Sequence, residues 1–414
     1  MLQPTLVKDP LRVPLNKIKP DYIHQLLEPM KIHINYREEQ LREGFEFKIK
    51  IRDTPRNKEN PTLRLASPDD AEIITNIVKE DYEGTYPYKE MEDPQEVRNM
   101  IESGKYKFVL FLNEDNEIIG TTCFVLDLEN KTGYTRTFVV KKECLGVLDS
   151  TKAYVGSFIA ICNKYKDKIH LWWGEARTAD AKSQYINRLC SFRPIGFLPN
   201  KDFFFNKIES DVIIACYNQK IFSQHRSSNQ PKIIPQVENC YEFSNDQYKL
   251  GKAKIVDPNI DFVSLEKKAN ELQKFLKFSS SADKFNYINY KLTLKNSDSF
   301  FSFLYTPRVN NFEKVKYKIY SLAELFLFAK KFQQIGFKLN IRYMESYISA
   351  YKPLDQKLFY ELGFNPRGYL PAWKLNKKNN KFKDYILFNW YRGSLNPIEM
   401  IDEGNRLLKC LNEF

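Results

Sequence analysis

The side chains of this 414-residue chain that could take part in chemistry are mainly carboxylates and phenols. Only four histidines occur and no two have the spacing of a metal-binding pair, which argues against HExxH zinc chemistry and a Ser-His-Asp triad. The seven cysteines are single, with no CxxC motif, so neither a zinc knuckle nor a disulfide framework is indicated. We therefore expect no metal and a reducing, cytoplasmic setting.

Glu175 is the first candidate for acid–base chemistry. It lies in the segment WWGEART, where a strand predicted over 169–176 ends. A carboxylate in such a position could take a proton from an amine through a water molecule. The alternative is an ion pair between Glu175 and Arg177, and the sequence weighs the two equally.

An aromatic and acidic segment, YEGTYPYKE, begins at Tyr82. Its tyrosines, which include Tyr86 and Tyr88, and its acids, of which Glu83 is the first, would suit a cationic amine. The alternative is an aromatic surface loop packed on the core. The sequence does not separate these two interpretations.

The elements that must position these residues follow from hydrophobic periodicity and from turn and cap residues. Ser67 and Pro68 mark the start of a helix. Between 62 and 217 the pattern predicts, in order, strand 62–66, helices 70–80 and 94–103, strands 106–113, 118–128 and 133–140, helix 150–165, strand 169–176, helix 181–190 and strand 210–217.

The two ends of this region have a different composition. Residues 1–60 are rich in proline and charge and form a predicted extension with one edge strand at 45–52. Residues 218–236 have the composition of a linker, so we place a domain boundary there. Beyond it, in 237–414, the pattern predicts helices at 262–278 and 321–336 and strands at 287–294, 300–305, 339–347 and 384–390.

An internal repeat links the two halves at an offset of 172 residues. DAKSQYINRLCSFRPIGFLP at 180–199 corresponds to KPLDQKLFYELGFNPRGYLP at 352–371. Each copy is a strand, helix, turn, strand unit, which is not a solenoid repeat. The alternative is that the two turns are alike only because Gly and Pro are common in turns. Six shared positions carry the match: Gln184/Gln356, Phe192/Phe364, Pro194/Pro366, Gly196/Gly368, Leu198/Leu370 and Pro199/Pro371.

Composition and charge limit the classes of function. Hydrophobic residues make up 43% of the chain, too many for a disordered protein, and the longest uncharged apolar stretch, VGSFIAIC, is too short to span a membrane. The net charge is +12, and 237–414 holds 29 Lys and Arg against 19 Asp and Glu. This excess suits an anionic partner such as CoA phosphates; a nucleic acid is also compatible but not favoured.

These segments together resemble the GNAT superfamily of acyl-CoA-dependent N-acyltransferases. The resemblance runs from about 62 to 217 through RLASPDDAEII, FVLFLNEDNEIIGTTCFVLD, TFVVKKECLGV and a helix ending in SFRPIGF. A weaker resemblance covers about 300–391, where Gly363-Phe364 keeps the family's GF pair. It implies a mixed α/β fold of two tandem GNAT-like domains, 61–217 binding acyl-CoA and 237–414 degenerate.

The resemblance also implies a binding site for acetyl-CoA or another acyl-CoA. The backbone of Phe138, Val139 and Val140 would bind the pantetheine amides, and a helix start at Ser150, Thr151 and Lys152 would hold the pyrophosphate. The family's phosphate loop has spaced glycines, whereas VKKECLGV has only Gly146. The family places the tyrosine that protonates the leaving thiolate five residues before the Phe of its GF pair, where this chain has Asn187, which would lie beside the cofactor. The nearest phenol, Tyr185, is the candidate proton donor, and the alternative is that its side chain is packed.

The function that this implies is transfer of an acyl group, in the first instance acetyl, from acyl-CoA to a small-molecule or peptide amine, without a membrane and compatible with a homodimer. One alternative resembles the Fem-like tandem enzymes, in which the basic second half would hold an aminoacyl-tRNA. The other is a non-catalytic binding protein with the same fold.

Overall fold

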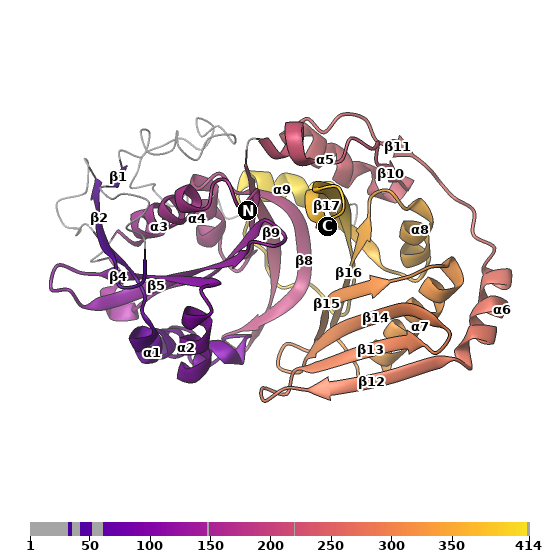
Figure 1. The fold of residues 1–414 in the computed structure, drawn as a ribbon, viewed down its shortest axis with the longest axis horizontal. Helices are drawn as coiled ribbons and strands as arrows, with labels where there is room; N and C mark the ends of the chain where they lie inside the picture. Colours follow the sequence, from indigo (N-terminus) through magenta and orange to yellow (C-terminus); the bar gives the residue numbers. More distant parts are fainter. Residues whose placement is uncertain (1–31, 35–41, 52–60, 147–148, 219, 412–414) are drawn as a thin grey trace.

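The structure, a computed structural model, describes residues 32–34, 42–51, 61–146, 149–218 and 220–411. Two large mixed sheets stand side by side and both carry helices (Figure 1). The predicted fold class, a mixed α/β protein with two sheets, is thus confirmed. No helix within the described residues has the length and apolar character needed to cross a membrane.

Nine strands form the first sheet: β1 (Ile32–Ile34), β2 (Glu46–Ile51), β3 (Thr62–Leu65), β4 (Tyr106–Leu112), β5 (Ile118–Asp127), β6 (Thr132–Val140), β7 (Leu171–Arg177), β8 (Arg193–Phe204) and β9 (Lys207–Tyr217). Their order is β1-β2-β3-β4-β5-β6-β7-β9-β8. All neighbours are antiparallel except β6 and β7, which are parallel. The strand predicted at 45–52 is present as β2, but it is not the edge of the sheet, because β1 pairs with its outer side. The rest of the 1–60 extension, apart from β1 and 42–45, lies outside the described residues.

Four helices cover the two faces of this sheet (Figure 1). On one face lie α1 (Ala71–Asp81) and α2 (Pro94–Glu102), and on the other α3 (Ser150–Lys164) and α4 (Lys182–Leu189). Asp93 caps α2 by accepting hydrogen bonds from the amides of Gln95 and Glu96. Helix α3 is buried continuously from Lys152 to Cys162, because its sequence is apolar or small on nearly every side.

The parallel pair β6 and β7 separates part of the way along the sheet. The two strands pair only from Thr132 to Thr135 with Leu171 to Gly174. Beyond that point β6 continues against β5 as far as Val140, and β7 continues against β9. A gap therefore opens in the middle of the sheet, with a free strand edge on each side.

The second sheet repeats this arrangement of strands. Its strands are β12 (Leu276–Ala282), β13 (Ile288–Leu294), β14 (Ser297–Thr306), β15 (Asn311–Lys318), β16 (Tyr343–Ser349), β17 (Asn365–Asn376) and β18 (Lys381–Tyr391). Their order is β12-β13-β14-β15-β16-β18-β17, and the parallel pair β15 and β16 shares only two residue pairs. The helices of this half are α5 (Glu238–Tyr248), α6 (Phe262–Gln273), α7 (Leu322–Lys338), α8 (Pro353–Glu361) and α9 (Asp402–Lys409).

Two predicted elements of the second half differ from the structure. The helix expected over 262–278 ends at Gln273, because the chain turns into β12 three residues later. The strand expected from 339 begins at Tyr343, because α7 runs on to Lys338 and a turn follows. Between β12 and β13 there is a tight hairpin, where the first half has α1 and α2 between β3 and β4.

The repeated turn lies where the two halves meet. A Cβ atom at Gly368 on β17 would be 2.3 Å from the carbonyl oxygen of Ile195 and 2.4 Å from the Cα atom of Gly196 on β8. Backbone therefore packs on backbone across the interface, which only glycine permits. Apolar residues of both halves surround this contact, including Leu198, Ile213, Tyr343, Leu370 and Leu387.

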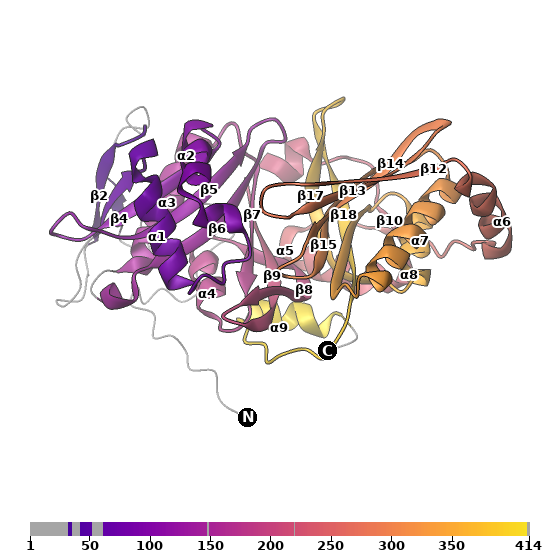
Figure 2. The ribbon, with the colours of Figure 1, turned by 90° about the horizontal axis from the view of Figure 1, so that it is seen from below.

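The chain after each sheet crosses to the other half. The side chain of Gln184 on α4 bonds the backbone of Glu399 and Ile401 in the C-terminal segment, and α9 packs on β8 (Figure 2). In the opposite direction, Gln356 on α8 bonds the backbone of Lys232 and Ile234, and α5 packs on β17.

The segment predicted as a linker is held firmly in the structure. Within the described part of 218–236, Ile221, Ile233 and Ile234 are buried, and β10 (Lys232–Ile233) pairs with β11 (Lys254–Ile255). Arg226 forms an ion pair with the fully buried Asp384 of β18. The segment connects the two sheets. It also forms part of the core, which its polar composition did not indicate.

Replacement of Gly368 by alanine should destabilise the protein by about 1–3 kcal/mol or more, because the new methyl group meets backbone that cannot rotate away. Gly196→Ala is the matched control, since its Cβ would lie 3.5 Å from side-chain atoms only. Urea unfolding of both variants measures the difference. An unchanged midpoint for Gly368→Ala would contradict the close packing of the two halves.

Candidate active site

The gap between β6 and β7 leads into a pocket of about 530 Å³. This volume is in the usual range for small-molecule sites. The pocket is lined from both free strand edges, from the end of α1, from α3 and α4, and from the hairpin formed by β8 and β9. It is the place in the first half where the sequence-predicted residues come together.

One wall of the pocket is the free edge of β6. Phe138, Val139 and Val140 all line it, as predicted for the residues whose backbone would meet a cofactor. A bulge in β6 puts Thr137 at a φ of 55°, and the Thr137 hydroxyl is 2.8 Å from that of Tyr86. The bulge bends β6 away from β7, so that this edge faces the pocket instead of another strand.

The start of α3 forms the adjacent part of the wall. Ser150 and Thr151 line the pocket, but Lys152 does not. The Lys152 side chain is 1% exposed and its Nζ atom lies 3.2 Å from the carboxylate of Asp149, which also caps the helix. The Lys152 ammonium therefore neutralises the carboxylate of Asp149. It does not line the pocket, where its side chain was expected to contact a phosphate.

Gly146 is also outside the pocket lining. It has a φ of 94°, a conformation that favours glycine, and a Cβ atom there would have no neighbour within 4 Å. The two residues that follow, 147 and 148, lie outside the described residues. Gly146 thus provides an open turn before α3, and its role toward a phosphate stays a prediction.

Helix α4 brings both of its predicted residues to the pocket, Tyr185 and Asn187. The Oδ1 atom of Asn187 accepts a hydrogen bond of 2.6 Å from the hydroxyl of Tyr154 on α3, and its amide group donates to the carbonyl of Ser183. Burial raises the pKa of Tyr154 well above its ordinary value. Asn187 therefore fixes the position of a second pocket phenol.

Glu175 is in the pocket wall, on the free part of β7. Its Oε1 atom lies 2.5 Å from the Nζ of Lys201, and its Oε2 atom accepts a bond of 3.5 Å from the hydroxyl of Tyr134. Arg177 instead holds Glu209 with two hydrogen bonds of 2.7 Å. The ion pair between Glu175 and Arg177 that the sequence suggested is therefore wrong: Glu175 pairs with Lys201, and Arg177 with Glu209.

The aromatic segment after α1 both packs and lines the pocket. Tyr82, Tyr86 and Tyr88 are all lining residues, and the rings of Tyr82 and Tyr86 are 4.7 Å apart. Burial raises the pKa of Tyr82 above its ordinary value, so this phenol stays protonated. Glu83 points elsewhere: it pairs with Lys142 on the surface and does not line the pocket.

Two carboxyl groups of the β8–β9 hairpin, Asp202 and Asp211, were missed by the sequence analysis. Both line the pocket and are 5% and 1% exposed. Burial raises the pKa of Asp202 to about 6, and burial followed by repulsion from Asp202 raises the pKa of Asp211. The sequence signal that could have indicated these carboxyl groups is LPNKD, which follows the repeated turn. It was not used, because no strand was predicted where β8 lies.

The second half supports this part of the pocket through Lys201. The side-chain amide of Asn311 donates a bond of 2.6 Å to the Lys201 carbonyl, and Arg342 donates another of 2.9 Å. Burial alone lowers the pKa of Lys201, but neighbouring carboxylates, first Glu175, outweigh it and raise the pKa well above its ordinary value. The ammonium that holds Glu175 is therefore fixed by residues of both halves.

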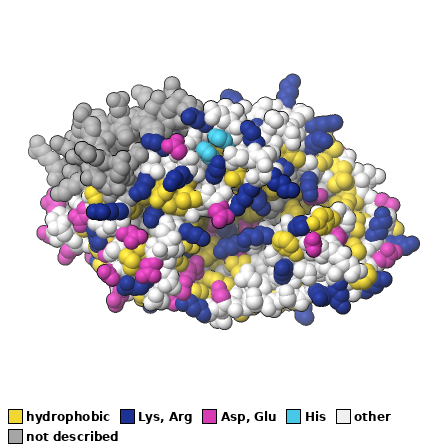
Figure 3. Space-filling model, in the orientation of Figure 1, with side chains coloured by type: hydrophobic (Ala, Val, Ile, Leu, Met, Phe, Trp, Pro, Cys, Tyr) yellow, Lys and Arg dark blue, Asp and Glu magenta, His cyan; other side chains and the backbone are white. Residues whose placement is uncertain are grey.

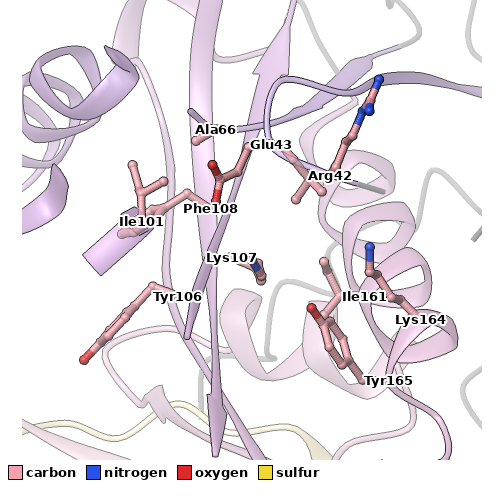
Figure 4. Close-up of a pocket in the computed structure, with 11 residues that line it drawn as sticks. Arg42, Glu43, Ala66, Ile101, Tyr106, Lys107, Phe108, Ile161, Lys164 and Tyr165 are labelled. Atoms are coloured by element: carbon pink, nitrogen blue, oxygen red, sulfur yellow. The ribbon is translucent and has the colours of Figure 1, made fainter. Parts of the chain in front are cut away.

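Other surface features of the described chain are less suited to catalysis. A second cavity, between Ala66, Phe108 and Tyr165, has about 20 Å³, enough for one water molecule (Figure 4). The described residues contain no group of three or more His, Cys, Asp or Glu side chains placed to bind a metal. On the face in Figure 3, Lys and Arg side chains are spread over both halves and form no single stripe.

The pKa of Glu345 on β16, beside this network, gives a test of its burial. Burial raises this pKa from 4.5 to about 7, so the folded state holds the proton more tightly than the unfolded state. We compare the free energy of unfolding of the wild type with that of a Glu345→Gln variant. The wild-type value minus the variant value is therefore greatest below pH 4.5 and falls as the pH rises to 7.

We expect a change of about 3 kcal/mol in this difference between pH 4.5 and pH 8, in favour of Glu345→Gln at high pH. Chemical unfolding of both proteins across this range measures it. Replacement of the exposed Glu102 by glutamine is the control and should show no such trend. A pH-independent difference for Glu345→Gln would contradict the buried neutral carboxyl.

Comparisons with known proteins give similarity at the level of structure. No protein-family model and no curated protein matches the sequence. The spermidine N-acetyltransferase from Vibrio cholerae in complex with CoA and spermine is 15% identical, with a TM-score of 0.33, over 39% of this chain and 96% of that chain. Its structure with manganese ions is 14% identical, with a TM-score of 0.32, over 40% and 96%. Its dodecameric structure is 12% identical, with a TM-score of 0.32, over 40% and 96%. Similarity at this level concerns the fold alone.

Proposed function

We propose that the protein transfers an acyl group, in the first instance acetyl, from acyl-CoA to a cationic amine. The observation that carries this proposal is the separation of β6 and β7 into a pocket that has a free strand edge at one end and carboxylates at the other. A thioester cofactor needs backbone hydrogen bonds and an amine needs a base, and the pocket offers both.

The acyl-CoA would lie along β6 and reach the start of α3. The backbone of Phe138 to Val140 supplies hydrogen-bonding groups for the pantetheine amides, and one of its N–H groups would polarise the thioester oxygen. Ser150 and Thr151 and the first amides of α3 face the same pocket, where a pyrophosphate would be bound by the helix N-terminus.

The amine would enter at the opposite end, between the aromatic segment and the carboxylates. Tyr82, Tyr86 and Tyr88 line this end of the pocket, where the Arg136 guanidinium already lies 6.0 Å and 5.2 Å from the ring centres of Tyr86 and Tyr88. Glu175 lines the same pocket, and its Oε2 atom accepts a hydrogen bond from Tyr134. This arrangement favours a protonated amine as the form that binds and a neutral amine as the form that reacts.

The reaction then requires two proton transfers. Glu175 accepts a proton from the ammonium through a water molecule, and the amine nitrogen attacks the thioester carbonyl. The resulting tetrahedral intermediate expels the CoA thiolate, and the second proton of the amine nitrogen reaches this thiolate by way of Tyr185, whose phenol gives up its own proton and takes the amine proton in its place. The products are the amide and free CoA, and the proton on Glu175 returns to solvent.

In this proposal the chain is divided into an extension (1–60), a catalytic domain (61–217), a connection (218–236) and a supporting domain (237–414). The second domain offers a poorer phosphate site, because only residues 319–321 separate β15 from α7, compared with 141–149 between β6 and α3. The carboxylate of Glu324 also accepts hydrogen bonds from the backbone amides of Tyr320 and Ser321, so these amides at the start of α7 are already engaged. A cytoplasmic location fits the free thiols of the described cysteines.

Binding of acyl-CoA by the intact chain is the direct test. Acetyl-CoA at about 100 times its dissociation constant should stabilise the protein by about 2.7 kcal/mol in a thermal-shift assay. Native mass spectrometry should find one CoA per chain. No shift with any CoA ester would contradict the proposal, and two CoA molecules would contradict the supporting role of the second domain. Salt-sensitive tRNA binding without CoA binding would favour the aminoacyl-tRNA alternative instead.

The Glu175→Gln variant should lower kcat by about 10²- to 10⁴-fold and leave the affinity for CoA nearly unchanged, because a general base acts on the amine and not on the cofactor. Steady-state rates and CoA titration of the variant measure both quantities. The Glu102→Gln variant serves again as the control. An unchanged kcat would make Glu175 a structural partner of Lys201 only.

A further inference from the structure

The Arg136 side chain, on β6, lines the pocket and has no part in the proposed proton transfers. It is 10% exposed, and within the described residues its Nε and Nη2 atoms have no hydrogen-bond partner. A buried cation whose donors are unused is costly unless a ligand supplies the acceptors. The two donors of Arg136 therefore indicate a ligand that accepts hydrogen bonds.

The neighbours of the Arg136 guanidinium do not supply these acceptors. The Oε1 atom of Glu90 is 3.8 Å from Nη2, too far for a hydrogen bond, and the Oε2 atom of Glu90 accepts a hydrogen bond of 3.1 Å from the hydroxyl of Tyr287 in the second half. The ring centres of Tyr86 and Tyr88 lie 6.0 Å and 5.2 Å from the guanidinium carbon. These rings attract the positive charge but leave the two N–H groups unused.

The unused atoms of Arg136 match the two oxygens of a carboxylate. The Nε and Nη2 groups of an arginine can donate two parallel hydrogen bonds to one carboxylate. The same chain shows this geometry at Arg177, whose Nε and Nη2 atoms each donate a hydrogen bond of 2.7 Å to Glu209. A second cation is close by, because the Lys314 ammonium lies 5.2 Å from the ring centre of Tyr88. This end of the pocket therefore favours an anionic group of the ligand.

Arg136 and Glu175 are on opposite sides of the gap between β6 and β7. Tyr134 on β6 is directly across from Trp173 on β7, and their ring centres are 4.4 Å apart. Arg136 and Glu175 are each two residues further along, so they belong to the same face of the sheet as these rings. Paired strands are about 4.8 Å apart, and β6 and β7 separate at this point. A short molecule with an ammonium and a carboxylate would reach both residues.

We propose that Arg136 is the binding subsite for a carboxylate of the acceptor, so that the acceptor is an amino acid whose ammonium lies at Glu175. This inference rests on the proposed function for the identity of the amine. The carboxylate supplies the hydrogen bonds that Arg136 lacks, and the guanidinium supplies the positive charge that a carboxylate needs when it leaves water. Arg136 binds and orients the acceptor.

The test compares glycine, β-alanine and 4-aminobutanoate with their amides, which keep the amine and lose the negative charge. Isothermal titration of the full chain, with CoA present, should show binding at least about tenfold tighter for one or more of these amino acids than for its amide. Arg136→Gln should bind that amino acid no more tightly than the amide. Arg136→Lys, which lacks the two parallel donors, should lose most of the preference and is the second variant if Arg136→Gln fails to fold. Arg406→Gln, an exposed change on α9, is the control that should bind as the wild type does.

The wild-type comparison requires no variant to fold. Amino acids that bind no more tightly than their amides, or do not bind, would overturn the inference, and so would a preference that both variants keep. Acyl transfer from acetyl-CoA is measured separately with the same compounds. Selective amino-acid binding that the variants lose, without acyl transfer, would support the subsite and contradict the proposed function. Equal acyl transfer to amino acids and amides would support the function and overturn the subsite.

An acyl group with a carboxylate of its own is the other source of the same chemistry. Titration of the wild type and Arg136→Gln with acetyl-CoA and succinyl-CoA separates the two sources. Equal affinity of the wild type for the two donors would support the assignment of Arg136 to the acceptor. A preference for succinyl-CoA that the variant loses, without a preference for amino acids, would overturn that assignment.

Discussion

The close contact of Gly368 with the backbone of β8 is the constraint on which the rest of the structure depends. It brings the edge strands β8 and β17 of the two sheets together without intervening side chains. Because β8 carries Lys201 and Asp202 at its far end, the same contact fixes one wall of the pocket. A looser interface would separate Lys201 from Asn311 and Arg342, and the ion pair with Glu175 would lose its support.

The sequence predicted those features that depend on local patterns. Helix α1 follows from its cap at Ser67 and Pro68 and from the apolar spacing of Ile74 and Ile77, and it forms within one residue of the expected ends. The strand β6 and the place of Glu175 near the end of β7 also follow from local alternation, whereas the place of the β6 backbone beside a cofactor was implied by the family resemblance. Each of these elements packs one apolar face against another element that is close to it in the sequence.

The features that the sequence did not predict depend on the distant half. Strand β8 contains two prolines and a glycine, which indicate a turn, and they are tolerated because the strand is at the edge of its sheet. Asp202 and Asp211 become buried only when that strand is in place. The partner of Glu175 is 26 residues away on an unpredicted element, so spacing favoured Arg177.

The crossing of α9 onto the first sheet has a consequence for how the molecule is made. Arg188 on α4 is paired with Glu403 on α9, which is 215 residues later in the chain. The ribosome therefore exposes α4 and β8 well before it completes the helix that covers them. The first domain therefore stays incompletely packed until α9 has been synthesised. Contacts between residues this far apart in the sequence also form slowly. The first domain should reach its final packing only after α9 has been released and has returned to it.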